Sequence, residues 1–289
     1  MDTLISFPLL GGGTFNLPRS ISIFGFEIYI YGLIIALGYG LAALYLYRRR
    51  DAFGLKSENV LDIIMCAVLA GIVGARLYYV AFAWKDEFAG KGFLNLINVR
   101  QGGLAIYGGL LGSTLAVFIY TRIKKINFLR TLDAVAVPVM IGQAIGRWGN
   151  LFNREAYGSE TTLPWRMGLH YPSGAEIYVH PTFLYDSLWN IIGAVALHIY
   201  AKRAKLRPNG QLFLLYVLWY GLGRVWIEGL RTDSLMLGSL RVSQLLAGVC
   251  IVGAACALVF LKLRKIPEIA TVGNRSENSE EHSDEDSDE

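Results

Sequence analysis

Long apolar runs separated by short polar connections dominate the pattern of this chain. About 20 mostly apolar residues are what an α-helix needs to cross the hydrocarbon core of a bilayer. Seven stretches approach that length: Glu27–Tyr47, Val60–Phe82, Leu104–Thr121, Leu132–Trp148, Thr182–Ala201, Leu212–Glu228 and Val242–Leu261. The pattern therefore predicts an all-α polytopic membrane protein with seven transmembrane helices. The fourth stretch is short, and we expect Pro138 to interrupt it.

Basic residues gather after every second stretch, and this predicts the topology. They are Arg48, Arg49, Arg50 and Lys56 after the first stretch, Arg122, Lys124, Lys125 and Arg130 after the third, Lys202, Arg203, Lys205 and Arg207 after the fifth, and Lys262, Arg264 and Lys265 after the seventh. Cytoplasmic loops carry an excess of lysine and arginine. We therefore expect the N-terminus outside the cell and the C-terminus in the cytoplasm.

Composition supports this class and separates the last residues from the rest. Hydrophobic residues make up 54% of the chain and charged residues 17%, which is not typical of a soluble globular protein. Residues 1–266 are expected to form one integral-membrane domain. Residues 267–289 are acidic and poor in apolar residues, which predicts a disordered cytoplasmic tail. The longest outer connection, Gly149–His180, is expected to form a small extracytoplasmic arm.

Three arginines, Arg76, Arg147 and Arg224, lie within apolar, glycine-rich stretches. A charge near the bilayer centre costs roughly 3 kcal/mol, so each arginine needs a compensating partner. In the predicted topology further polar residues reach the same outer depth: Tyr31, Tyr107, Asn150, His180 and Glu228. Ionisable residues at membrane depth usually mark a functional site. The pattern therefore indicates a polar site that opens to the outer side.

Each of these features also has a structural interpretation. Arg224 and Glu228 lie four residues apart, on one helical face with Tyr220, and could simply hold helices together as an ion pair. Small residues such as Gly142 and Gly146, and likewise Ala70 and Gly74, favour close helix packing. Taken alone, Tyr107 is typical of an interfacial aromatic belt and His180 of a structural group at a helix start. Packing does not explain the polar run that follows Arg147, in which two amides and a carboxylate could bind a polar head group.

The polar run Gly146–Glu155, with Gly158, resembles the signature of the bacterial prolipoprotein diacylglyceryl transferases. Further matches occur in the family's order over nearly the whole chain outside the acidic tail. They are Tyr31-Gly32, Gly74-Ala75-Arg76, Gly102–Gly109, His180–Tyr185 and Tyr220–Arg224 with Glu228 and Arg231. The combination is far more specific than any single motif.

The resemblance implies an enzyme of the bacterial cytoplasmic membrane with its active site toward the extracytoplasmic leaflet. It implies transfer of the sn-1,2-diacylglyceryl group of phosphatidylglycerol to the lipobox cysteine of a prolipoprotein precursor, which yields a thioether and glycerol phosphate. The expected partners are this lipid, the precursors and the bilayer, with no nucleic acid. No metal or cofactor is expected, because none of the four histidines has ligand spacing to a cysteine or carboxylate.

Chemistry assigns roles to the matching residues. Arg147 and Arg224 are expected to clamp the phosphate and stabilise the leaving oxygen. A carboxylate, Glu155 or Glu228, is expected to take the thiol proton. Some family members carry His in place of Tyr107 and Glu in place of Asp186; a phenol is a poor base at neutral pH, so the identity of the base stays open. The expected binding and supporting residues are Asn150, Asn153, Gly158, His180, Tyr31, Arg76 and Tyr220.

Two other functions fit parts of the pattern. A transporter or channel could use buried arginines, but it predicts polar residues through the whole bilayer depth, whereas here they concentrate on the outer side. A seven-span receptor accounts for the number of spans but not for Arg147 together with Arg224. The stretch Val242–Leu261 contains no lysine for a retinal.

Overall fold

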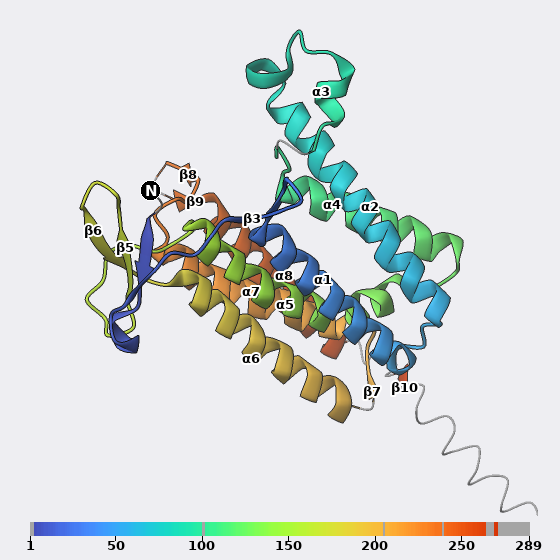
Figure 1. The fold of residues 1–289 in the computed structure, drawn as a ribbon. Helices are drawn as coiled ribbons and strands as arrows, with labels where there is room; N and C mark the ends of the chain where they lie inside the picture. Colours follow the sequence, from blue (N-terminus) through green and yellow to red (C-terminus); the bar gives the residue numbers. More distant parts are fainter. Residues whose placement is uncertain (1–2, 100–101, 205, 239, 264–268, 271–289) are drawn as a thin grey trace, which may run out of the picture. The chain divides into compact units, whose positions relative to one another are not determined.

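The structure is a computed structural model that describes residues 3–99, 102–204, 206–238, 240–263 and 269–270. It is mostly helical (Figure 1). The contacts divide the described chain into two compact units. The first unit comprises residues 3–45 and 133–270, and the second comprises residues 46–132.

Each predicted apolar stretch corresponds to one long helix, although the first three residues of the first stretch, Glu27–Tyr29, lie in a strand. The helices are α1 (Ile30–Arg49), α2 (Ser57–Phe82), α4 (Ile106–Ile123), α5 (Phe128–Asn153), α6 (Thr182–Arg203), α7 (Gln211–Leu230) and α8 (Val242–Leu263). Five of them, α1, α2, α4, α5 and α8, are long and apolar enough to cross a membrane. The chain is therefore a polytopic membrane protein. The helices α6 and α7 are not among these five, and the number of seven spans stays a prediction.

The interruption expected at Pro138 was wrong. The helix α5 runs through this proline over 26 residues. It is the most buried of the candidate spans, and Ala134, Val137 and Met140 are all inside the protein. Proline is tolerated in a membrane helix because neighbouring groups satisfy the freed backbone. A locally unfavourable residue therefore does not end the central helix of the first unit.

Small residues let α1 and α5 approach each other in the first unit. A Cβ on Gly38 of α1 would lie 3.3 Å from the carbonyl oxygen of Gly142, and one on Gly146 would lie 3.2 Å from the Ile35 side chain. The Tyr31 ring covers Gly149 so closely that a Cβ there would overlap it. The predicted packing role of Gly142 and Gly146 is confirmed, and it places Tyr31 beside the polar end of α5.

In the second unit, α2 and α4 approach even more closely. A Cβ on Gly74 would overlap the carbonyl of Gly108, and one on Gly112 would overlap the carbonyl of Ala70. The predicted small-residue contact at Ala70 and Gly74 is therefore confirmed. Before α4 the chain forms a π-helical turn (Trp84–Phe88) and the short α3 (Phe93–Ile97).

A four-stranded antiparallel sheet corrects the all-α expectation. Its order is β2 (Thr14–Phe15), β1 (Leu4–Ser6), β5 (Met167–His170) and β6 (Glu176–Val179). The predicted arm thus contains the hairpin β5–β6, and strands from the N-terminal segment complete its sheet. Buried side chains under the sheet are Ile5, Leu151, Met167, Leu169, Val179 and Phe183. Figure 1 shows the sheet at the N-terminal end of α6.

Short strands occupy several connections. They are β3 (Ser20–Ile23) with β4 (Phe26–Tyr29), β7 (Leu206–Arg207) with β10 (Ile269–Ala270), and β8 (Met236–Leu237) with β9 (Leu240–Arg241). Single 3-10 turns lie at Pro8–Leu10 and Arg50–Phe53. The predicted disordered tail, 267–289, lies outside the described residues except for the two residues of β10.

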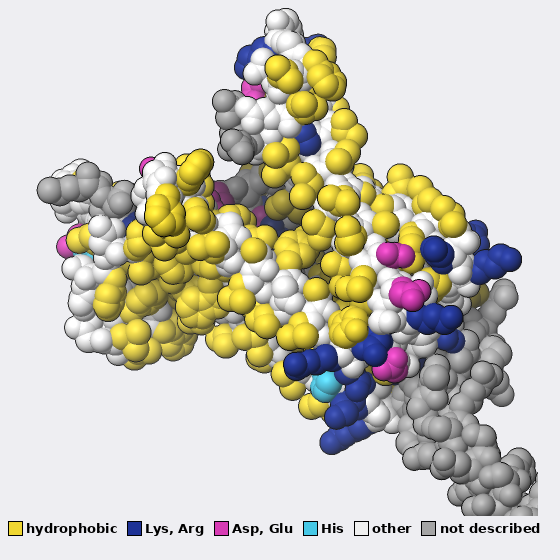
Figure 2. Space-filling model, turned by 45° about the vertical axis from the view of Figure 1, so that its right-hand side comes forward, with side chains coloured by type: hydrophobic (Ala, Val, Ile, Leu, Met, Phe, Trp, Pro, Cys, Tyr) yellow, Lys and Arg dark blue, Asp and Glu magenta, His cyan; other side chains and the backbone are white. Residues whose placement is uncertain are grey.

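Exposed apolar stripes fit a lipid environment. On α1 the side chains of Leu33, Leu37, Leu41 and Leu44 follow offsets of four, four and three, and each is more than 40% exposed. Figure 2 shows hydrophobic side chains over much of the visible surface. Apolar faces of this extent mark a surface that contacts something other than water, which for helices of this length is lipid.

Candidate active site

The Arg147 guanidinium pairs with a buried carboxylate on the neighbouring helix. Its Nε lies 3.2 Å from Oδ2 of Asp186, and the two side chains are 21% and 8% exposed. Arg147 stands nearly two turns before the end of α5, and Asp186 stands in the second turn of α6. Nearby, Trp148 donates a hydrogen bond to Ser187 at 3.1 Å, and its ring packs edge-on against Phe183. These contacts hold the end of α5 against the start of α6.

Arg224 and Glu228 form the ion pair that their spacing predicted. Nη2 of Arg224 lies 2.8 Å from Oε2 of Glu228, whose side chain is only 4% exposed. The other terminal nitrogen of Arg224, Nη1, is buried and has no hydrogen-bond partner among the residues that the structure describes. A buried guanidinium N–H without an acceptor is costly. The geometry therefore leaves Arg224 able to bind an anion while Glu228 holds its other side.

Arg231 and Asp233, just after α7, form a bidentate pair. The Arg231 Nε and Nη2 donate to the two Asp233 oxygens at 2.9 and 2.8 Å. The Arg231 hydrogen bond holds the pKa of Asp233 below its ordinary value, and the same bond raises the pKa of Arg231. Arg231 is also within electrostatic reach of Glu228 and Asp186. The charged side chains at the N-terminal end of α6 and at the C-terminal end of α7 therefore form one network of alternating sign.

The polar run after Arg147 folds back on a single carboxylate. The side-chain amides of Asn150 and Asn153 both donate to Oε1 of Glu155, at 2.9 and 3.2 Å. The backbone N–H of Glu155 donates to the carbonyl of Asn150 at 3.1 Å. Glu155 is itself exposed, and the residues on either side of it, Arg154 and Ala156, have positive φ angles of 56° and 57°. Left-handed backbone at two non-glycine residues is costly and is typical of a functional loop.

Arg154 holds this loop and the N-terminal segment together. Its guanidinium donates to the carbonyls of Thr3, Phe152 and Leu17 at 2.5, 3.1 and 2.7 Å, and to the Asn16 side chain at 3.2 Å. Arg154 is buried. Sequence reasoning did not assign it a role, since nothing local shows that strands from the N-terminus return to it.

Gly158 and His180 lie where the arm meets α6 and α7. Gly158 N–H donates to the carbonyl of His180 at 3.0 Å, and a Cβ on Gly158 would lie 2.7 Å from Cβ of His180 and 3.1 Å from the carbonyl oxygen of Leu230. The His180 Nδ1 lies 3.2 Å from the hydroxyl of Tyr185, which accepts a hydrogen bond from Trp165. No larger residue fits at position 158.

Two tyrosines of the predicted site lie in the first unit. Tyr31, at the start of α1, is within electrostatic reach of Arg147 and Glu155. Tyr220, one turn before Arg224 on α7, packs its ring against Tyr216, whose hydroxyl accepts a hydrogen bond from Gln143 at 3.1 Å. The structure thus places Tyr31 beside the arginine and carboxylate, and Tyr220 deeper along α7.

Arg76 and Tyr107 belong to the second unit. The Arg76 guanidinium is buried and donates to four carbonyls, those of Asn95, Leu96, Gly102 and Gly103, at 2.7–3.0 Å. These carbonyl dipoles compensate its charge and fix the loop that leads into α4. Tyr107, in the first turn of α4, is 46% exposed. Arg76 therefore organises the loop that precedes Tyr107.

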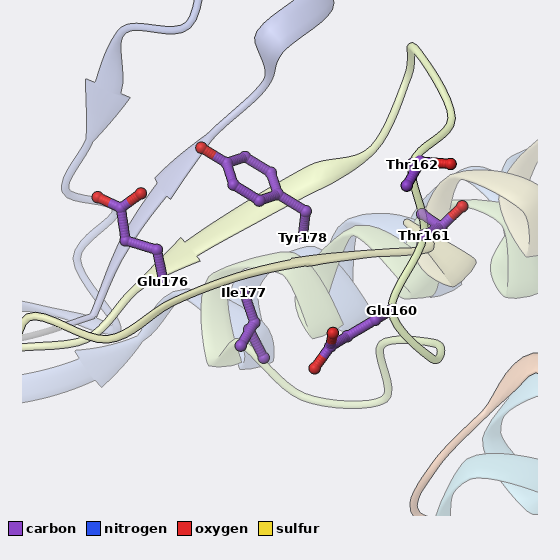
Figure 3. Close-up of a pocket in the computed structure, with 6 residues that line it drawn as sticks. All are labelled: Glu160, Thr161, Thr162, Glu176, Ile177 and Tyr178. Atoms are coloured by element: carbon purple, nitrogen blue, oxygen red, sulfur yellow. The ribbon is translucent and has the colours of Figure 1, made fainter.

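A hollow of about 510 Å³ lies elsewhere, on the arm. Figure 3 shows its lining, formed by the loop Glu160–Thr162 and by β6. Two carboxylates, Glu160 and Glu176, line it, and none of the arginines of the network does. An acidic hollow does not suit an anionic ligand, so the candidate active site is the arginine network and not this hollow.

Most of the predicted site residues meet at one end of the first unit. The predicted residues that belong to the network or its loop, or interact with them, are Arg147, Asn150, Asn153, Glu155, Arg224, Glu228 and Tyr31. Asp186 was noted in the sequence only as a difference from some relatives. Its spacing gives no sign that it pairs with Arg147, because the two residues come from different helices.

Comparisons with known proteins identify the family. The profile of the prolipoprotein diacylglyceryl transferase family matches residues 18–260. Proteins named phosphatidylglycerol–prolipoprotein diacylglyceryl transferase are similar to the chain. That of Bacillus cytotoxicus is 41% identical over 83% of this chain and 89% of the relative, and that of Clostridioides difficile is 42% identical over 83% and 93%. That of Listeria welshimeri is 41% identical over 86% and 91%. The chain therefore belongs to the prolipoprotein diacylglyceryl transferase family.

Proposed function

We propose that the chain transfers the sn-1,2-diacylglyceryl group of phosphatidylglycerol to the thiol of the lipobox cysteine of a prolipoprotein. The sulfur forms a bond to the glycerol carbon, the carbon–oxygen bond to phosphate breaks, and glycerol phosphate leaves. Family membership and the names of the relatives support this reaction. The observation that carries the site is the pair of partly buried arginines, each held by its own buried carboxylate on α6 or α7.

Arg147 and Arg224 act as the phosphate clamp. Negative charge builds on the departing oxygen, and a guanidinium offers planar donors that remain charged in a low dielectric. The unsatisfied Nη1 of Arg224 supplies a donor for that charge, while the pairing with Glu228 fixes the orientation. Donors that are oriented before the reaction stabilise a transition state at no cost of reorganisation.

Glu155 is the carboxylate that the contacts favour as base. Glu228 is buried and paired with Arg224, so protonation of Glu228 would break an ion pair. Glu155 is exposed, and the side-chain amides of Asn150 and Asn153 both donate their hydrogen bonds to its Oε1. Its other oxygen, Oε2, is therefore able to accept the thiol proton. Nearby arginines favour the thiolate. Asn150 and Asn153 then position the base as well as the head group.

Tyr107 donates a hydrogen bond to the lipid head group, and Arg76 supports it by fixing the preceding loop. Tyr31 supports Arg147 and Glu155 from α1. Gly158, His180 and Tyr220 shape the surroundings of the lipid.

The topology proposed for the membrane has seven spans, an outer N-terminus and a cytoplasmic C-terminus, in the bacterial cytoplasmic membrane. Residues 1–266 are the catalytic domain and 267–289 an acidic cytoplasmic tail. Basic residues in the last turns of α1, α4, α6 and α8 support the orientation. The arginine network lies at the start of α6 and the end of α7, opposite the basic end of α6. The active site therefore faces the extracytoplasmic leaflet.

Single substitutions test the roles. Transfer of labelled diacylglyceryl from phosphatidylglycerol to a lipobox peptide is measured for Arg147→Ala, Arg224→Ala, Glu155→Gln and Tyr107→Phe. Loss of either arginine should lower kcat at least 100-fold, about 3 kcal/mol. Glu155→Gln should abolish turnover, whereas Tyr107→Phe should keep substantial activity because the phenol is not the base. Near-normal turnover of Arg147→Ala would show that the clamp assignment is wrong.

A further inference from the structure

The hairpin β3–β4, immediately before α1, has one face that is entirely apolar. Its register pairs Ile21 with Ile28 and Ile23 with Phe26. Residues that face each other across an antiparallel pair, and residues two apart along a strand, share one face. These four side chains therefore form the apolar face of the hairpin. The opposite face carries Ser20, Ser22, Glu27 and Tyr29.

The residues that the structure describes leave most of this apolar face open. Ile21, Ile23 and Phe26 are 45%, 46% and 77% exposed. Within the described part of the chain, the hairpin forms a sheet of its own two strands. An isolated two-stranded hairpin is marginally stable in water and needs packing against another surface. The hairpin would therefore gain stability if an apolar surface covered this face.

The turn of the hairpin is unfavourable for a protein loop in water. Phe24 and Gly25 both have positive φ angles, 51° and 82°. Two-residue turns of this kind favour Asn-Gly or Gly-Gly, and a bulky residue with positive φ is an outlier. The Phe24 side chain is also 99% exposed. The backbone strain at Phe24 persists in any medium, but its fully exposed ring would gain stability by contact with an apolar medium.

The hairpin is continuous with a candidate membrane span. The strand β4 ends at Tyr29 and α1 begins at Ile30, whose N–H donates to the carbonyl of Arg19 at 2.9 Å. The first residues of a span lie at the boundary of the bilayer, so the hairpin lies at the same depth. Arg19, at its base, is exposed and can reach lipid phosphate.

We propose that the β3–β4 hairpin is a membrane-surface anchor whose apolar face and Phe24 ring insert into the bilayer interface at the start of α1. The outer edges of the two strands have unpaired backbone groups, which hydrocarbon would not tolerate. The hairpin therefore lies flat at the interface, with its polar face toward water. This requires α1 to span the membrane and does not depend on the proposed reaction.

Spin labels on the two faces test the anchor. The full chain, with Cys66→Ala, Cys250→Ala and Cys256→Ala, is reconstituted in vesicles of phosphatidylcholine and phosphatidylglycerol. A nitroxide is then attached to Phe24→Cys or Phe26→Cys on the inserted side. The matched variants Ser22→Cys and Glu27→Cys carry the label on the opposite face of the same hairpin. Accessibility to oxygen, which concentrates in lipid, is compared with accessibility to a water-soluble nickel chelate.

The labels at positions 24 and 26 should be several-fold more accessible to oxygen than to the chelate, and those at 22 and 27 should show the reverse. The backbone at Phe26 does not have a positive φ angle. A label at position 26 therefore reports on the apolar face even if the variant at position 24 changes the turn. Chelate accessibility at position 26 equal to that at positions 22 and 27 would overturn the proposal, because it would place both faces in water.

Discussion

Removal of the Asp186 carboxylate tests whether the ion pair with Arg147 orients the phosphate clamp. The two charged atoms lie 3.2 Å apart, so their attraction is about 5 kcal/mol at an effective dielectric constant near 20. The cost of removing both charges from water offsets part of this attraction. The attraction is weakened further because Arg147 is partly exposed to solvent. We expect Asp186→Ala to destabilise the protein by about 2–3 kcal/mol. A clamp that is no longer oriented should also lower kcat/KM by about 100-fold, which corresponds to about 3 kcal/mol.

The assay must separate orientation of Arg147 from general stability. Asp133→Ala is the matched control, because Asp133 is also a buried aspartate and accepts hydrogen bonds from the N–H groups of Gly210 and Phe213 at the start of α7. It should lower the thermal midpoint but leave kcat/KM of the folded enzyme nearly unchanged. Asp186→Glu keeps the charge and should retain most activity.

Lipid transfer to a lipobox peptide is measured below the thermal midpoint of every variant. If Asp186→Ala keeps kcat/KM within threefold of the natural chain, Arg147 does not depend on this partner. If Asp133→Ala loses as much kcat/KM as Asp186→Ala, the loss reflects stability and not orientation. Either result refutes the reasoning.

Three further predictions concern the framework. Gly74→Val should destabilise the second unit by about 3 kcal/mol, measured as thermal unfolding in detergent, because any Cβ there overlaps the backbone of α4. Arg154→Ala should cost about 3 kcal/mol and speed proteolysis of residues 10–17, since three of its hydrogen bonds hold the N-terminal segment. The pairing with Arg231 lowers the pKa of Asp233, so its stabilisation is present above the unfolded pKa of about 3.9 and is lost as the pH falls through the folded value. The thermal midpoint should therefore fall less steeply below about pH 4 in Asp233→Asn.

Each of these predictions has its own control. Gly32→Val, on α1, meets open space and should leave the midpoint almost unchanged. Arg166→Ala removes an arginine of the arm that bonds to nearby carbonyls and stacks on Tyr178, and proteolysis of the N-terminal segment should not change. An identical acid dependence of the natural chain and Asp233→Asn would contradict the assigned role of Asp233.

Local patterns predicted much of the framework. An apolar run long enough to cross a bilayer forms a helix in any context that lacks water, because its backbone must be satisfied within the segment. All seven stretches are therefore helical, and the pairing of Arg224 with Glu228 follows from one helical turn. Glycine spacing likewise predicted close helix packing at Ala70 and Gly74, and the structure identifies the partner as α4. The interruption at Pro138 failed because packing around α5 outweighs a single local preference.

The sequence by itself determined the apolar helices, the residues that match the family and the pairing of Arg224 with Glu228. Only the tertiary structure decided which partner holds each charge: Asp186 for Arg147, backbone carbonyls for Arg76, and the N-terminal segment for Arg154. It also decided that the arm is a sheet completed by strand β1. Pairings between residues far apart in the chain depend on how several elements pack at once, so no single segment encodes them.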